Sequence, residues 1–350
     1  MKARSNFATV KQLILDTFRQ AVASGICWMM LTVTALCVVL CLSVNVSGDV
    51  ALHGEDEPVL FLPPPSPRAG APSAAASQSG GLSPDTNPEE ARREGVETIS
   101  GRMTLAFGAV SFPVCRERGD AVHFLELLLA GGVAGTLGLL LALVWTAGFV
   151  PTFLEPSAAS VLLAKPVARW QLLLGKYFGV LTFVGFHVVL FVVSTWLALG
   201  VRTNVWDLTY WRCIPLLLLQ FAIFFSFSVL LAVVTRSTVA CVFGSVLFWL
   251  LAWGINYGSV MAHGMPEPQY LPSFTLALAE VAYWIFPKPI DAGLILFNAL
   301  HAQHHFEKPV VFKLLESGQA FSPQLSILSS LVITGVLLAL SAFEFNATDY

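Results

Sequence analysis

The sequence predicts an all-α protein that crosses a membrane six times. Of its 350 residues, 56% are hydrophobic and only 12% are charged, whereas a soluble domain carries about 25% charged residues. Six stretches contain no Asp, Glu, Lys or Arg, and each is long enough to cross a bilayer, which takes roughly 20 apolar residues. These stretches are residues 20–48, 127–154, 177–201, 213–235, 237–266 and 317–343.

An amphipathic helix is expected ahead of the first span. Phe7, Val10, Ile14 and Phe18 recur at helical spacing among lysines and arginines. A basic amphipathic helix of this kind lies on a membrane surface with its apolar face in the lipid. The alternative is a disordered basic start of the chain.

The distribution of charge predicts how the spans are oriented. The N-terminal segment is basic, and the loop between the second and third spans holds three basic residues against one acid, Glu155. The opposite side receives residues 49–122, with eleven acids and six arginines. Because short basic loops stay in the cytoplasm, both termini are expected on the cytoplasmic side of the inner membrane. The net charge of −3 gives no indication of nucleic-acid binding.

Two long segments are expected outside the membrane. The first is rich in Pro, Ser and Ala to about residue 97, a composition that cannot bury a core, and residues 98–114 then alternate as a β-hairpin does. The second contains six prolines and a short apolar stretch, 292–306, which is expected to lie at the interface. The expected organisation is an amphipathic helix at 1–20, spans at 21–47, 123–152, 177–201, 213–235, 236–262 and 323–343, exoplasmic segments at 48–122, 202–212 and 263–322, a cytoplasmic loop at 153–176 and a cytoplasmic tail at 344–350.

The sequence offers no nucleotide-binding loop. A Walker A motif reads G-x-x-x-x-G-K-[ST], and Gly175-Lys176 completes only part of it, because Trp170 and Tyr177 occupy the positions of the first glycine and the hydroxyl residue. This chain is therefore not expected to bind ATP or to be an enzyme.

The spans also lack the charges that ion-coupled transporters carry. Apart from Glu126 at one edge, their cores contain no acid or base, and His187 is the one titratable group near a span interior, where it is expected to hydrogen-bond a neighbouring helix. Energy for any transport must come from a partner. His301, His304 and His305 have the H-x-x-H-H spacing of some di-iron enzymes, but no second histidine box exists, so a solvated helix end is expected rather than a metal site.

The loop between the second and third spans, residues 153–176, has the pattern of a stiff elbow, and we use that name for it below. Pro151 and Pro156 interrupt the second span, and Ser157 can cap a short helix. Lys165-Pro166 ends that helix, since the residue before a proline disfavours the α conformation. Arg169 and Lys176 are expected to anchor the third span at the lipid headgroups.

Here the sequence resembles the permeases of the bacterial ABC type-2 (ABC-2) transporter family. Members carry the motif L-L-x-K-P-[VI]-x-R-x-x-[LW]-L-x-G-K-[YF]-x-G in this position. The likeness is local to residues 145–179, with agreement elsewhere in the six-span layout. The matching residues are Leu162, Leu163, Lys165, Pro166, Val167, Arg169, Leu173, Gly175, Lys176, Tyr177 and Gly179.

The resemblance implies a function and a set of partners. Two permease copies, identical or different, would pair with separate ABC ATPase subunits that bind ATP and Mg²⁺. The elbow would bind the ATPase, and the movement of the ATPase during ATP hydrolysis would displace the elbow and drive export. No catalytic, cofactor-binding or metal-binding residue is implied in this chain. The implied coupling residues are Glu155, Pro156, Ser157, Lys165, Pro166, Arg169, Gly175 and Lys176.

Two other functions remain open from the sequence. The first is a membrane scaffold of the same fold that uses an ABC ATPase for envelope assembly or motility. The second is a membrane metalloenzyme built on the histidine cluster at 301–305.

Overall fold

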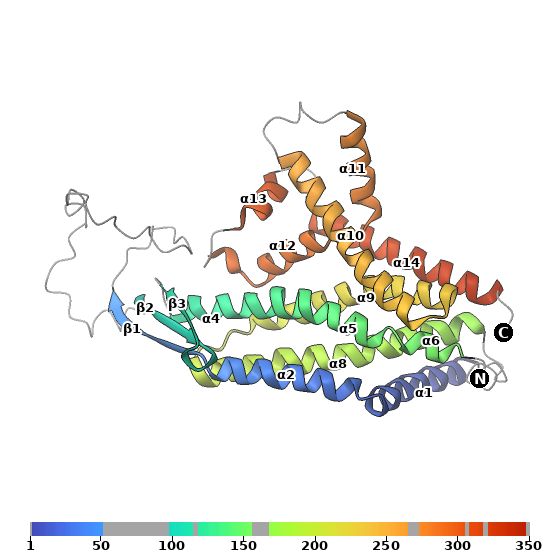
Figure 1. The fold of residues 1–350 in the computed structure, drawn as a ribbon, viewed down its shortest axis with the longest axis horizontal. Helices are drawn as coiled ribbons and strands as arrows, with labels where there is room; N and C mark the ends of the chain where they lie inside the picture. The colour runs from blue at the N-terminus through green and yellow to red at the C-terminus, as the bar shows by residue number, and fades with distance from the viewer. Residues whose placement is uncertain are drawn as a thin grey trace.

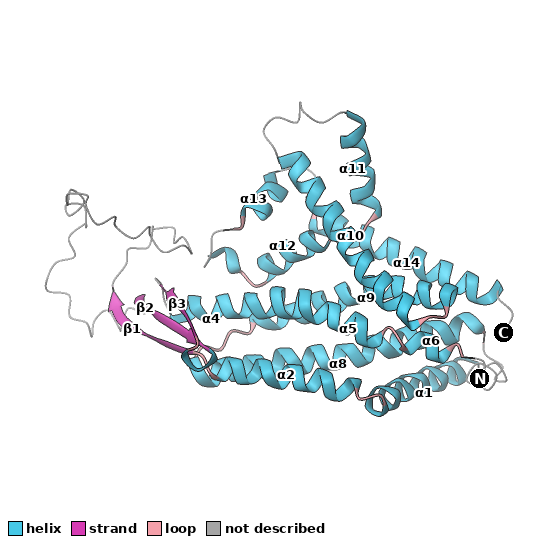
Figure 2. Ribbon diagram, viewed as in Figure 1, coloured by secondary structure: helices cyan, strands magenta, loops and turns pink. Residues whose placement is uncertain are grey.

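The chain is an all-α polytopic membrane protein with a small β-sheet at one end (Figures 1 and 2). The computed structural model describes residues 2–51, 98–114, 118–155, 168–264, 273–304, 308–317 and 321–347. Within these residues, five helices are long and apolar enough to cross a membrane, and a bent pair of helices supplies a sixth span if its two parts count as one.

The bent pair begins the chain. α1 (Lys2–Ala23) and α2 (Ile26–Leu42) meet at an angle of 72°. Gly25 stands between them with φ 77°, a left-handed conformation that glycine adopts without the steric penalty of a side chain. A helix is therefore present ahead of the first apolar helix, as predicted, and it turns sharply into that helix.

The remaining spans form a bundle with α2. The second consists of α4 (Arg118–Leu127), the π-helical segment η2 (Leu128–Gly138), α5 (Leu139–Thr146) and α6 (Phe149–Phe153). The third is α8 (Arg169–Thr203), and the fourth is η3 (Thr209–Arg212) with α9 (Cys213–Thr235). The fifth and sixth are α10 (Thr238–Gly264) and α14 (Pro323–Ala347).

The core of the bundle lies where α5, α8 and α9 meet. Leu143, Phe183 and Phe225 are fully buried there, and the Tyr177 hydroxyl donates a 2.9 Å hydrogen bond to the carbonyl of Ala222. The outward faces of α10 and α14 expose large apolar side chains such as Phe243. Exposure of this kind suits a surface covered by lipid.

The sheet has three antiparallel strands in the order β1 (Asn45–Ala51), β2 (Thr98–Leu105) and β3 (Val110–Val114). The expected hairpin at 98–114 is confirmed, with η1 (Ala106–Gly108) at its turn. The pairing of β1 with β2 was not predicted, because residues 45–51 are too short and too polar to show a strand pattern.

Four short helices follow α10: α11 (Ser273–Ile285), α12 (Pro289–Ala299), η5 (Ala302–His304) and α13 (Val310–Ser317). In Figure 1 they gather around the far end of α10, which runs obliquely away from the bundle. The start of α1 and the end of α14 lie at one end of the bundle, and the sheet lies at the opposite end. The placement of both termini in the cytoplasm stays a prediction.

Candidate functional site

The two helices that flank the elbow are described, and its middle is not. α6 ends at Phe153 and leads to the exposed Glu155, while Arg169 begins α8. Pro156, Ser157, Lys165 and Pro166, and with them the predicted short helix, lie outside the described residues. The first turns of α8 lie beside α1 (Figure 1), and the end of α6 approaches α1 at Gln20, near the end of that helix.

Two glycines of α8 allow α1 to pack closely against it. A Cβ atom added at Gly175 would lie 2.5 Å from Leu13 Cδ1, and one added at Gly179 would lie 2.7 Å from Thr17 Oγ1. Leu13 and Thr17 are both buried. Helices approach this closely only where one of them carries residues without bulk. Gly175, a predicted coupling residue, thus belongs to a helix–helix contact.

Aromatic packing extends the same contact along α8. Phe18 of α1 packs edge-on against Phe183, with ring centroids 5.4 Å apart, and against Phe186 at 6.1 Å. α1 is therefore held by protein on one face. Its predicted place on the membrane surface stays a prediction.

Lys176 is buried, which corrects its expected role as a headgroup anchor. Its ammonium donates hydrogen bonds to Gln20 Oε1 at 2.6 Å and Thr17 Oγ1 at 3.4 Å. It also lies 5.5 Å from the centre of the Phe149 ring and 5.9 Å from that of Phe153. The reason for the burial is that α1 covers this face of α8, a packing that a basic residue at the start of a span does not reveal.

Gln20 connects α1 to both helices of the elbow. Its carbonyl oxygen accepts the bond from Lys176 on α8, and its amide donates to Thr152 Oγ1 on α6 at 3.3 Å. One side chain of α1 thus touches the helix that enters the elbow and the helix that leaves it. A spacing of three residues between Thr17 and Gln20, polar positions next to the apolar stripe of α1, is the sequence signal that could have indicated this contact.

A second polar cluster, which the sequence did not indicate, surrounds the fully buried carboxylate of Asp291 at the start of α12. Asn256 Nδ2 donates to it at 3.0 Å, the Tyr283 hydroxyl at 2.6 Å, and the Ser326 hydroxyl also donates to it. These donors come from α10, α11 and α14, so one carboxylate joins three helices to α12.

Lys288 lies beside this cluster. Its ammonium is 4.5 Å from the ring centres of both Tyr283 and Trp284 and donates to the Ser329 hydroxyl. Burial lowers the pKa of Lys288, and the charge of Asp291 opposes that shift.

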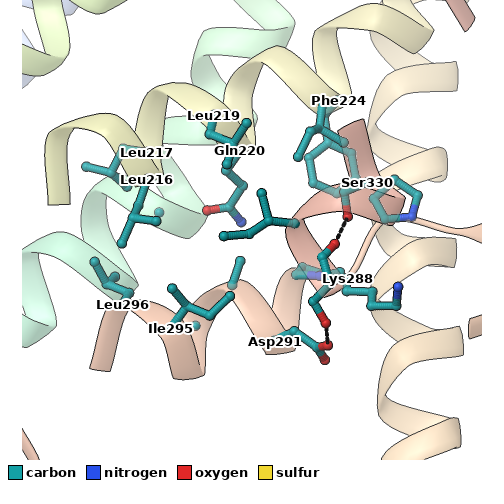
Figure 3. Close-up of a pocket in the computed structure, with 18 of the residues that line it drawn as sticks. Leu216, Leu217, Leu219, Gln220, Phe224, Lys288, Asp291, Ile295, Leu296 and Ser330 are labelled. Carbon is teal, nitrogen blue, oxygen red and sulfur yellow. Dashed lines mark hydrogen bonds between the residues drawn. The ribbon is translucent and has the colours of Figure 1, made fainter. Parts of the chain in front are cut away.

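A cavity of about 100 Å³ lies between α9 and α12 (Figure 3). Leu216, Leu217 and Leu296 lie at one end, and Lys288 and Asp291 lie at the other. A more apolar cavity of about 190 Å³ lies between α2, the second span, α8 and α9. Gln220 lines both cavities.

His187 and His301, two of the histidines singled out in the sequence, lie in different parts of the fold. His187 Nδ1 donates to the carbonyl of Phe183 on its own helix at 3.0 Å, and Nε2 lies 3.8 Å from Cys27 Sγ on α2. His301 is exposed and its Nε2 accepts a 2.6 Å bond from Arg212, whereas His305 lies outside the described residues. Because the positively charged Arg212 side chain already contacts His301 Nε2, a metal cation is disfavoured at that nitrogen.

These features define a class of protein: a multi-pass helical membrane subunit in which the first helix contacts both the helix that ends the second span and the helix that begins the third. The model of the ABC-2 family transporter proteins matches residues 18–350, and the chain belongs to that family. It is thus a permease subunit of an ABC transporter, a membrane subunit rather than an enzyme, and such subunits associate with an ABC ATPase. A search of curated proteins found no match.

Proposed function

We propose that this chain is the permease of an exporter in the inner membrane, driven by a separate ATPase that binds the elbow from the cytoplasm. The contact of Gln20 with both α6 and α8 carries the proposal. Because one side chain of α1 bonds to both arms, a push on the elbow moves α1, α6 and α8 together. The closed ATPase pair and a second permease copy, identical or different, complete the transporter.

α8 is suited to carry that movement across the membrane. It is continuous over 35 residues, and at a rise of 1.5 Å per residue such a helix is about 50 Å long. Its first turns pack under α1 and its far end lies at the sheet (Figure 1). A displacement applied at Arg169 therefore reaches the other side of the bundle without an intervening hinge.

Charge reversal at the elbow tests the proposal. We expect Lys165→Glu combined with Arg169→Glu to lower the amount of ATPase that purifies with the permease about tenfold or more, since like charges facing each other across an interface cost several kcal/mol. The partner is the ABC ATPase that purifies with the native chain, and the readout is the ATPase-to-permease ratio after affinity purification.

Arg236→Glu is the matched control. Arg236 is an exposed arginine in the short turn between α9 and α10, predicted to face the same side, and it lies outside the elbow. Retention of the ATPase by the doubly reversed variant contradicts the proposal, as does equal loss in the control. Transport into inside-out vesicles then tests export itself, and ATP hydrolysis that no substrate stimulates indicates the scaffold function instead.

A further inference from the structure

Three potential metal ligands meet near the sheet end of the bundle: His123, Glu126 and Asp207. His123 and Glu126 stand three residues apart on α4 and so share one face of that helix. Asp207 lies in the connection between α8 and η3. His123 Nδ1 is 3.4 Å from Glu126 Oε2 and 3.3 Å from Asp207 Oδ2.

We propose that these three side chains bind one Zn²⁺ ion. Zinc bonds to imidazole nitrogen and carboxylate oxygen are about 2.0–2.2 Å long, and a tetrahedral site of that size separates its ligand atoms by about 3.4 Å. The two separations from His123 Nδ1 have this value. The arrangement therefore requires little rearrangement to accept the ion.

Burial and charge favour a divalent cation at this place. The Glu126 side chain is only 3% exposed, and a buried carboxylate is costly unless a positive charge compensates it. With a neutral imidazole, the two carboxylates carry two negative charges, which one Zn²⁺ balances. The side chains of His123 and Asp207 are 19% and 13% exposed, so the site is open on one side to an entering ion and to water as the fourth ligand.

The surroundings hold one of the ligands in position. The backbone N–H of Thr209 donates to Asp207 Oδ1 at 2.8 Å, and the Thr209 hydroxyl donates to Oδ2. Trp196 Nε1 donates to the backbone carbonyl of Asp207 at 2.8 Å. Such supporting bonds orient metal ligands. One nitrogen and two oxygens suit zinc better than Mg²⁺ or Ca²⁺, which take oxygen ligands.

The bound ion would join the start of the second span to the turn that follows the third. These two spans are also joined by the elbow at the opposite end of the bundle. An ion at His123 therefore fixes the pair at the end far from the ATPase, so that movement of the elbow tilts them as one body.

Metal titration of the whole chain tests the site. We expect tag-free protein in detergent, stripped with EDTA, to bind one equivalent of Zn²⁺ in competition with a chromophoric chelator. Co²⁺ in its place gives the intense visible absorption of a tetrahedral site. His123→Ala and Asp207→Asn each weaken Zn²⁺ binding at least tenfold, in line with losses of about 10–100-fold on removal of supporting groups alone.

Two histidines outside the proposed site provide the matched control. His301→Ala combined with His304→Ala removes two histidines from the same chain and leaves the bound equivalent of Zn²⁺ in place. Zn²⁺ also raises the melting temperature of the native chain and leaves that of folded His123→Ala unchanged. Absence of a stoichiometric ion, or its loss only in the His301/His304 variant, overturns the proposal.

Discussion

Gly179→Leu is expected to abolish coupling between the ATPase and the permease. A Cβ atom at this position already lies 2.7 Å from Thr17 Oγ1 and 3.4 Å from the carbonyl oxygen of Leu13. The first contact is closer than a real Cβ atom tolerates, and the rest of a leucine side chain would need further space on the α1 side, so α1 must move away. Overpacking of this kind costs about 1–3 kcal/mol, and the movement also breaks the bond between Gln20 and the buried Lys176, with hydrogen bonds to charged groups contributing about 1.5–3 kcal/mol each.

The measurement is substrate-stimulated ATP hydrolysis by the reconstituted complex, which should fall to the basal rate. ATPase recovery on purification should change little, because the elbow itself is intact. Gly335→Leu is the control: Gly335 is exposed on α14 and a Cβ atom there meets nothing within 4 Å. Full stimulation in Gly179→Leu would show that α1 need not follow the elbow, and an equal loss in the control would assign the effect to general instability.

The membrane spans could be predicted because the insertion of a helix into the bilayer depends on its amino-acid composition alone. A charge-free stretch of about 20 residues has few alternatives to a membrane helix. Lys176 shows where this reasoning stops. A lysine at the start of a span usually extends to the lipid headgroups. At Lys176 the side chains of Gln20 and Thr17 take the place of the headgroups as hydrogen-bond partners. Only the packing of α1 against Gly175 and Gly179 of α8 reveals this.

The polar clusters could not be predicted for a related reason. Asp291, Asn256 and Ser326 are separated by 35 residues on each side, and no spacing rule connects them. His123 and Glu126 show a helical spacing, but Asp207 joins them through a turn whose place depends on the whole length of α8. Sequence patterns report which side of one helix is apolar, whereas these clusters depend on where four helices cross.

Asp291→Ala is expected to loosen the helices that follow α10. Three donors from α10, α11 and α14 lose their common acceptor, and each buried donor left without a partner costs about 1–3 kcal/mol. Lys288 also loses the negative charge beside its buried ammonium. Breaking a buried polar centre of this kind costs about 3–5 kcal/mol, which we expect to lower the melting temperature in detergent by roughly 10 °C.

Two further variants test whether the fall in melting temperature comes from the loss of the Asp291 carboxylate. Asp291→Asn keeps the size of the side chain and one acceptor oxygen, so its melting temperature should lie between those of the native chain and the alanine variant. Glu316→Ala removes an acid from the same region, where Glu316 pairs with Lys308 at 2.7 and 2.8 Å near the surface, and exposed pairs contribute only about 0–1 kcal/mol. A fall in Asp291→Ala no larger than that of Glu316→Ala would show that the carboxylate does not hold these helices together. Because the donors converge from three separate helices on one fully buried group, the larger fall is the outcome that the packing requires.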